Sequence, residues 1–399
     1  MSKSMPEYGW RSASSQREEL RRKSSTDQHP TSREHPKFNN LPWLLDVDRL
    51  RFFSPAACVS GGLRPNKAKM SSVASITIHP SQFPENVRLD LLESLRTRCV
   101  NHKFHYDSVR QTQKWLALHQ AYSPSRTDPN CGAIYDRGFA SAVSGIAGDY
   151  IHLVGLGCGG GQKDSRLLAL ARAENKKVFY TPSDVSVAMV LVARETALSV
   201  ISRDRCFPLV CDLATTMDLK AVLDAQPAPQ ASRLITFFGM IPNFEPHAIM
   251  PRIAELLTGD DRLLFSANLA PGPDYQAGVE RILPLYDNEL TRDWLLVFLR
   301  DLGVEVRAGD LHFAIEDVAE AGNLKRVAAY YRFKNSCEIS IDSDRVHLDS
   351  GDTLRLFFSY RHTPATVEAL LARHGLQVMD RWITDSEEEG LFLCRIYDL

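Results

Sequence analysis

The sequence lacks the features that mark several classes of protein. No apolar run approaches the roughly 20 residues of a transmembrane helix, and the first 40 residues contain no apolar segment of a secretory signal peptide. The eight cysteines are scattered without a Cys-x-x-Cys pair, and the twelve histidines lack the spacing of metal ligands. The net charge of −2 gives no general reason to expect a nucleic-acid partner. These absences predict a cytoplasmic chain with free thiols, no metal site, no nucleic acid and no membrane contact.

Charge is distributed unevenly along the 399 residues. Residues 1–70 hold 13 Lys and Arg against 7 Asp and Glu, a net of +6, which leaves −8 for the remainder because the whole chain sums to −2. This first segment is rich in Ser, Arg, Glu, Gln and Pro and has little to bury. It is therefore predicted to be a disordered basic leader.

Strands and helices alternate through the middle of the chain. Strand-like apolar runs occur at 150–154, 177–181, 208–211, 233–238 and 259–267, with helical patterns at 165–172, 187–200 and 249–257 between them. This alternation predicts an α/β fold built on a mostly parallel, doubly wound sheet with right-handed crossovers. Ahead of the sheet we expect helices at 83–118 and 138–147, separated by a loop at 119–129.

Beyond residue 268 the pattern changes. We expect one or two helices at 275–302, strands at 326–333, 337–341 and 352–359, a helix at 363–375 and a last strand at 389–396. This mixture predicts a smaller α+β accessory unit. The predicted organisation is a main domain at 71–268 with an N-terminal helical segment, an accessory substrate domain at 269–375, and a return to the main domain at 376–399.

The glycine-rich turn after the first strand of the sheet is the most informative local feature. Gly155, Gly157 and Gly159 follow an apolar strand and precede a helical pattern. Glycine allows positive φ and removes the Cβ that would keep a backbone away from a nucleotide-like ligand. The phosphate-binding pattern GxxxxGK[ST] is missing, and the turn only loosely resembles GxGxxG.

Acidic residues follow the next two strands. Asp184 is placed to accept hydrogen bonds from both hydroxyls of a ribose, and Asp212 to accept one from an adenine amino group. Two carboxylates disfavour further phosphates, so a cationic adenosyl ligand, S-adenosylmethionine (SAM), suits these strand ends better than NAD. The alternative is that each Asp only caps the next helix and that Lys163 is an ordinary exposed residue of a first helical turn.

These segments resemble the histidine-specific SAM-dependent methyltransferases, typified by the histidine Nα-methyltransferase of ergothioneine biosynthesis. The segments that carry the resemblance occur in the family's order at 103–107, 121–128, 156–163, 181–186, 211–213, 237–246, 285–287 and 354–361. The resemblance implies a Rossmann-like class I methyltransferase fold. It also implies that Lys163, Leu213 and Gly239 join the glycine turn and the two aspartates in binding SAM. On the substrate side it implies roles for Tyr106, Tyr122, Ser123, Asn243, Tyr286, Phe357 and Ser359.

Three departures from the family pattern concern the substrate and the cofactor turn. Phe357 stands where the family has a glutamate that binds imidazole, and Ser123 stands where it often has a second tyrosine. Gly155 replaces a residue that is usually acidic. Because an apolar ring cannot accept a hydrogen bond from imidazole N–H, the implied substrate keeps an amine but lacks an imidazole.

We therefore predict a SAM-dependent N-methyltransferase of a small amine or amino-acid-like substrate other than histidine. Asn243 and Tyr106 are the candidates for orienting the acceptor, and Tyr286 for holding its polar head. Trp294 is expected to line an apolar pocket or to pack in the core. Two alternatives stay open: methylation of O, S or C, and a degenerate member that serves as an interaction scaffold. The sequence leaves the oligomeric state open.

Overall fold

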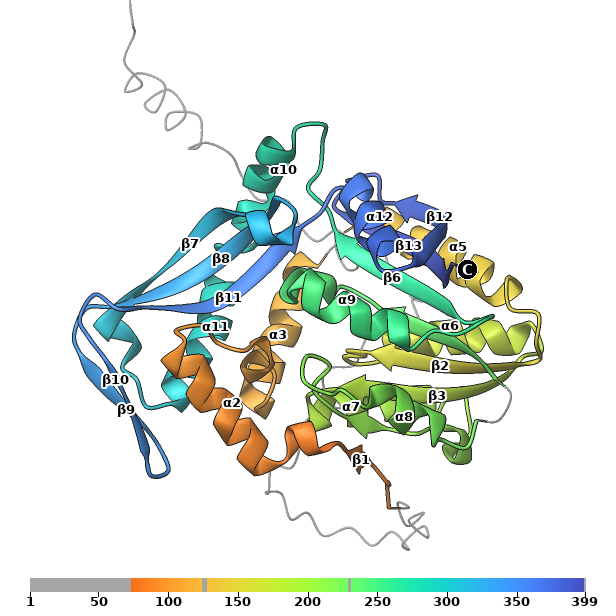
Figure 1. Ribbon diagram of the computed structural model, residues 1–399, viewed down its shortest axis with the longest axis horizontal. Coiled ribbons are helices and arrows are strands. Elements are labelled where there is room, and N and C mark those ends of the chain that lie inside the picture. Colours follow the sequence, from red (N-terminus) through yellow and green to blue (C-terminus); the bar gives the residue numbers. More distant parts are fainter. Residues whose placement is uncertain (1–72, 124–127, 229–230, 398–399) are drawn as a thin grey trace, which may run out of the picture. The chain divides into compact units, whose positions relative to one another are not determined.

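The computed structural model describes residues 73–123, 128–228 and 231–397, so the predicted leader lies outside the described residues. A mixed sheet of eight strands in the order β1-β4-β3-β2-β5-β6-β13-β12 forms the centre of this part of the chain (Figure 1). The strands are β1 (Thr77–Ile78), β2 (Tyr150–Leu156), β3 (Lys177–Asp184), β4 (Leu209–Val210), β5 (Ser232–Phe237), β6 (Arg262–Asn268), β12 (Leu376–Ile383) and β13 (Glu389–Ile396). Strands β1 to β6 pair in parallel, and only the β13 pairings are antiparallel. The predicted doubly wound sheet is confirmed.

Helices cover both faces of this sheet, as the alternation of strands and helices requires. On one face lie α5 (Pro129–Ser144), α6 (Gln162–Ala173) and α7 (Val187–Ala197), and on the other α8 (Leu219–Asp224), α9 (Pro246–Glu255) and α12 (Pro364–Arg373). In Figure 1, α9 and α12 lie in front of the sheet and α5 and α6 behind it. Strand β2 is buried on both faces by these layers, which explains its nearly continuous apolar sequence.

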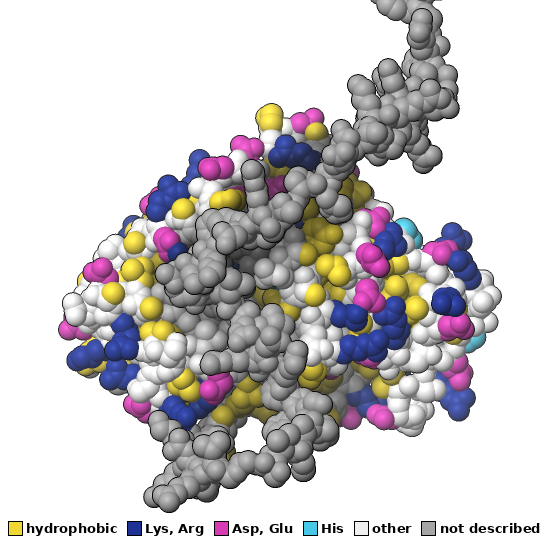
Figure 2. Space-filling model, turned by 180° about the vertical axis from the view of Figure 1, so that it is seen from behind, with side chains coloured by type: hydrophobic (Ala, Val, Ile, Leu, Met, Phe, Trp, Pro, Cys, Tyr) yellow, Lys and Arg dark blue, Asp and Glu magenta, His cyan; other side chains and the backbone are white. Residues whose placement is uncertain are grey.

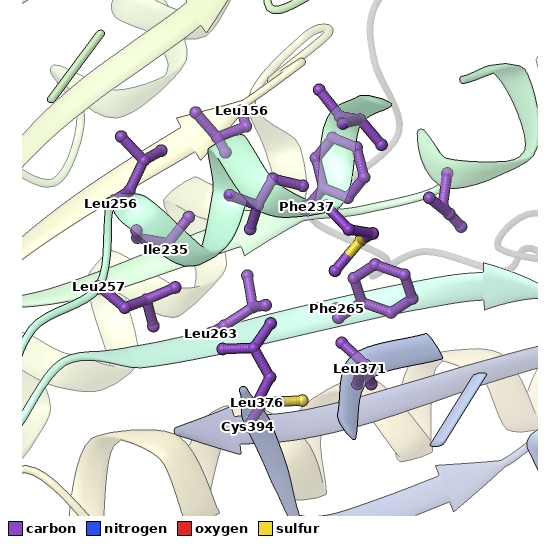
Figure 3. Packing of buried hydrophobic residues seen from close by; sticks show 14 of the residues in the cluster. Leu156, Ile235, Phe237, Leu256, Leu257, Leu263, Phe265, Leu371, Leu376 and Cys394 are labelled. Atoms are coloured by element: carbon purple, nitrogen blue, oxygen red, sulfur yellow. The ribbon is translucent and has the colours of Figure 1, made fainter. Parts of the chain in front are cut away.

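The core on the α9 side joins distant parts of the chain. Figure 3 shows Phe237 and Phe265 from neighbouring strands packed with Leu371 of α12 and Leu376 of β12. Helix α12 thus packs against the main sheet, although it falls within the range predicted for the accessory domain. The domain boundaries at 268 and 375 stay a prediction.

A second sheet lies beside the main one (Figure 1). It has three antiparallel strands in the order β11-β8-β7, namely β7 (Gly309–Val318), β8 (Leu324–Phe333) and β11 (Thr353–Arg361). A hairpin of β9 (Cys337–Ile341) and β10 (Asp344–Leu348) follows β8. Helices α2 (Pro84–Arg96), α3 (Val109–Tyr122) and α11 (Glu289–Asp301) contribute to the core that packs on this sheet. The N-terminal helical segment therefore shares a core with the accessory strands.

The structure corrects several predicted elements. The single helix expected at 83–118 is two helices, because the 3-10 turn η3 (His102–His105), capped by the side chain of Asn101, separates α2 from α3. Helix α5 begins at Pro129 instead of residue 138, since Asp128 caps it and proline suits its first turn. Strands β7, β10 and β12 were not predicted.

The visible surface carries charges of both signs. On the face seen in Figure 2, Lys and Arg side chains lie among Asp and Glu instead of gathering in one patch. Within the described ranges, none of the helices is both long enough and apolar enough to cross a membrane. The seven cysteines of those ranges are free thiols.

Candidate active site

The glycine turn has the geometry that its sequence predicts. Gly157, Gly159 and Gly161 have φ values of +63°, +51° and +72°, a region that favours glycine. Gly161 is also the N-cap of α6, and a Cβ there would lie 2.7 Å from the Cα of Ala193 on α7. Conformation and close packing therefore both require glycine at the end of this turn.

Asp184 holds the turn from the end of β3. Its carboxylate accepts hydrogen bonds from the backbone N–H of Gly159 at 3.1 Å and of Ser186 at 3.0 Å. Ser186, not Asp184, is the N-cap of α7, so helix capping does not account for this aspartate. Burial raises the pKa of the Asp184 carboxyl. Each of its oxygens accepts one N–H and retains lone pairs for a ligand hydroxyl.

Asp212 is buried, with 3% of its surface exposed. Its Oδ1 accepts the N–H of Ala214 at 2.8 Å, whereas Oδ2 has no hydrogen-bond partner among the described residues. Lys103 Nζ lies 3.2 Å from Oδ2, close enough for an ion pair, and also pairs with Asp90. A carboxylate oxygen with spare hydrogen-bonding capacity at this strand end suits an adenine amino group.

A small crevice lies beside the end of β3. Its walls include Lys103 and Phe104 from η3, and Val185, the residue after Asp184. None of the predicted cofactor residues lines this crevice, so the place of the adenosyl group stays a prediction.

The remaining predicted cofactor residues differ in their settings. Gly239, with φ +65°, has open space where a Cβ would project, and it donates its N–H to Ser266 Oγ. Leu213 packs in the core of the main sheet. Lys163 Nζ donates to the Tyr135 hydroxyl at 2.8 Å and lies 3.5 Å from Glu389 Oε1. Lys163 is therefore held by internal partners and is not simply a solvated first-turn residue.

Aromatic side chains form the wall between the glycine turn and the second sheet. The ring of Phe357 lies 5.6 Å from His102, 5.8 Å from Trp294 and 6.1 Å from Tyr286, between ring centres. The Tyr106 hydroxyl is 2.9 Å from His102 Nε2. Phe357 and Trp294 both belong to the core of the second sheet, so their packing role and their place in this wall coincide.

Trp115 of α3 connects this wall to the turn. Its ring lies 5.7 Å from that of Tyr106 and comes within 3.9 Å of the position a Cβ would take at Gly159. Tyr122 and Ser123 lie further along, at the C-terminal end of α3, next to residues outside the described ranges. Their predicted roles in substrate binding stay predictions.

Polar side chains continue the row beyond Phe357. Ser359 Oγ and the Tyr286 hydroxyl are 2.8 Å apart, and Arg361 Nη2 donates to that hydroxyl at 2.6 Å. Phe357, Ser359 and Arg361 alternate along β11 and so project from one face of the strand. Asn243, in the 3-10 turn after β5, donates its Nδ2 hydrogen to the Phe358 carbonyl at 2.7 Å. Asn243 and Tyr286 thus both contact strand β11, to which Ser359 belongs.

Arg361 was not among the predicted site residues. Only 4% of its surface is exposed, its Nε has no partner, and no carboxylate of the described residues forms an ion pair with it. The alternation from Phe357 through Ser359 indicates the face of the strand from which the Arg361 side chain projects. The sequence does not show that the charge of Arg361 lacks a partner. A buried guanidinium in this state is a candidate for binding an anion.

His105 is a buried neighbour of this aromatic wall. It is fully buried, its ring is tilted against that of Trp294 with ring centres 5.2 Å apart, and its Nε2 lies 2.5 Å from the Leu356 carbonyl oxygen. Burial lowers its pKa to about 4, because the apolar surroundings disfavour the imidazolium. Neutral His105 is part of the wall's packing. Within the described ranges, no cluster of His, Cys, Asp or Glu is arranged to hold a metal ion.

Comparison with known proteins identifies the family of this fold and site. Residues 86–396 match the model of the family described as histidine-specific methyltransferase, SAM-dependent. The chain belongs to this family. It is thus a SAM-dependent methyltransferase, and the predicted resemblance, class of enzyme and cofactor are confirmed.

The solved structures that match are distant. The magnesium protoporphyrin IX methyltransferase from Synechocystis PCC 6803, with bound SAH, is 13% identical, with 74% of this chain and 98% of that chain covered and a TM-score of 0.38. For the SAM-bound amino pentose methyltransferase from Micromonospora echinaspora these values are 12%, 70%, 97% and 0.33. No curated protein matches the methyltransferase sequence. The family match, not these structures, therefore carries the assignment.

We predict that Asp184→Asn weakens SAM binding by roughly tenfold or more, since it replaces a charged acceptor at the strand end. Isothermal titration of the full chain with SAM measures the change, and Asp204→Asn, an exposed substitution before β4, is the matched control. Wild-type affinity in Asp184→Asn would show that this carboxylate does not contact the cofactor.

Proposed function

We propose that this methyltransferase N-methylates a small amine that carries a carboxylate, an amino acid or a close derivative, and that histidine is not its preferred substrate. The observation that carries the proposal is the row of β11 side chains in which apolar Phe357 is followed by Ser359 and by the unpaired Arg361. This row combines an apolar surface with a polar and cationic end. We propose a cytoplasmic setting as well, which the free thiols support.

Arg361 is the reason to propose a carboxylate on the substrate. A buried charge without a partner costs several kcal/mol, and the cost falls when an opposite charge binds. The guanidinium presents a planar pair of N–H donors that matches a carboxylate. Tyr286 and Ser359 lie beside it, with hydroxyls that can donate to the same group. An amine without an anionic group would leave the Arg361 charge unpaired.

The aromatic wall is the reason to propose that the rest of the substrate is apolar or aromatic. Phe357 offers no acceptor for an imidazole N–H, and burial holds the pKa of the nearby His102 well below its usual value. His102 is therefore neutral and adds no charge to the wall. A phenyl, indole or aliphatic side chain loses less on entering these surroundings than an imidazole does.

SAM, when bound, supplies a methyl group on a sulfonium, which is already a good leaving group. The chain's contribution is to bring a neutral amine into line with that methyl. Asn243 is fixed through Nδ2, which leaves its Oδ1 to accept an N–H of the amine and to direct the lone pair. Burial raises the pKa of Tyr106, so its hydroxyl stays protonated and serves as a hydrogen-bonding group.

The direct test is incubation of the full chain with labelled SAM and a panel of acceptors. The panel contains aromatic amino acids, their decarboxylated amines, histidine, and compounds with only O or S acceptors. Mass spectrometry then locates the methyl group. We expect label on the nitrogen of carboxylate-bearing amines. Methylation of O, S or C overturns the N-methylation, and an absence of SAM binding would leave the role of a scaffold.

We predict that Arg361→Leu raises the KM for an amino-acid substrate by about 10- to 100-fold, because a charge-assisted hydrogen bond to the carboxylate is lost. The KM for the matching decarboxylated amine should change little. Steady-state kinetics on both acceptors provide the comparison, with Arg373→Leu on the exposed side of α12 as control. Equal effects on both acceptors would contradict a carboxylate at Arg361.

We predict that Phe357→Glu raises the affinity for histidine by about tenfold, since the new carboxylate can accept the imidazole N–H. Phe357→Gln is the matched variant, equal in size but uncharged, and should give a smaller gain. Titration of each variant with histidine in the presence of SAH measures the affinities. No gain in either variant would show that position 357 does not face the acceptor's side chain.

A further inference from the structure

Gly155 is a glycine for a different reason from the glycines that follow it. Its φ does not lie in the left-handed region, unlike those of Gly157, Gly159 and Gly161. The constraint is space, because a Cβ at Gly155 would overlap Oδ2 of Asp164. The position at which the turn leaves β2 is therefore taken by a carboxylate that reaches in from α6.

Asp164 is the third residue of α6, and only 3% of its surface is exposed. Its Oδ2 accepts the Tyr180 hydroxyl at 2.8 Å, and its Oδ1 accepts the Thr236 hydroxyl at 2.9 Å. Tyr180 lies on β3 and Thr236 on β5, the two neighbours of β2 in the sheet. Thr236 pairs with Gly155 in the strand register. The carboxylate thus spans β2 at the residue where the glycine turn begins.

The surroundings of Asp164 contain no opposite charge that neutralises it. Among the described residues it forms no ion pair, and the neighbouring Lys163 is engaged with Tyr135 and Glu389. Burial raises the pKa of Asp164 to about 6, and the titratable groups facing it are Tyr180 on β3, Cys158 in the turn and Lys163. Burial also raises the pKa values of Tyr180 and Cys158, so both stay neutral.

A buried negative charge at this place suits a positively charged ligand. The first turn of a helix also favours an acidic side chain, because free N–H groups and the helix dipole point toward it. Hydroxyl donors on both sides fix the carboxylate, so its charge is held in place before any ligand arrives. The Asp164 carboxylate is distinct from the two aspartates at strand ends, and it takes no part in the proposed acceptor site.

We propose that Asp164 is a positioning residue for the cofactor, which fixes the glycine turn to β3 and β5 and supplies the buried negative charge beneath it. Gly155 and Asp164 then act as one unit. The space beside Gly155 holds a single carboxylate, and this carboxylate comes from α6 instead of from β2. A family member with an acidic residue at position 155 would fill the same space from the strand. The inference goes beyond the proposed function, since it does not depend on the acceptor.

A purely structural clamp is the competing role, and charge separates the two. Asp164→Asn keeps the size of the side chain and can still accept a hydroxyl hydrogen, but it removes the charge. We expect it to weaken SAM binding by about tenfold near pH 8. In the wild type, SAM affinity should fall as the pH drops through about 6, because the carboxylate becomes protonated. In Asp164→Asn that part of the pH dependence should be lost.

The reciprocal exchange tests the shared space. Gly155→Asp alone should weaken SAM binding more than Asp164→Ala does, since it forces two carboxylates together. The double variant Gly155→Asp/Asp164→Ala should bind SAM within about threefold of the wild type. Isothermal titration of the full chain with SAM gives all of these values, and thermal unfolding of each variant without SAM shows that it folds.

Tyr180→Phe provides a test that keeps Asp164 intact. It removes one donor without adding volume, so the pKa of Asp164 should rise and the fall in SAM affinity should begin at a higher pH. An affinity within twofold of wild type in Asp164→Asn, with an unchanged pH profile, would overturn the proposed charge. A double variant no better than Asp164→Ala would overturn the shared space. Neither outcome bears on the amine substrate, because no acceptor is present in these titrations.

Discussion

The parallel pairing of the central strands is the constraint on which the site depends. Because β2, β3 and β5 run in one direction, their carboxyl ends meet at one edge of the sheet, and everything that follows a strand is brought together there. The glycine turn follows β2, Asp184 ends β3, and Asn243 follows β5. Residues almost 90 positions apart in the sequence are thereby brought to the same edge of the sheet. No specific contact between them is needed for this.

A second, smaller sheet supplies what the strand ends lack. The parallel sheet presents backbone and carboxylates, which suit a cofactor, but little that distinguishes one acceptor from another. Strand β11 adds Phe357, Ser359 and Arg361 in alternation, and α3 and α11 close the wall with aromatic side chains. Under the proposed function, the cofactor and the acceptor are therefore bound by different sheets, and Tyr106 and Trp115 lie where the two meet.

The sequence was a good guide wherever one residue type has one reason to be there. Positive φ explains Gly157 and Gly159, and strand ends explain Asp184 and Asp212, so these could be predicted. Asp164 could not, because an acidic residue in a first helical turn is common and its contact with Thr236 spans 72 positions. The unpaired charge of Arg361 is likewise a property of its surroundings.

The hydrogen bond from Asn243 to strand β11 has a consequence for how such an enzyme can change. Its acceptor is the backbone carbonyl of Phe358, not a side chain, so it survives any substitution on that strand that leaves the backbone in place. The role proposed for Asn243 therefore does not depend on the neighbouring side chains that are proposed to select the acceptor. Under the proposed function, substitutions at position 357 can change the preferred acceptor without moving Asn243, so substrate preference is easier to evolve than the geometry of methyl transfer.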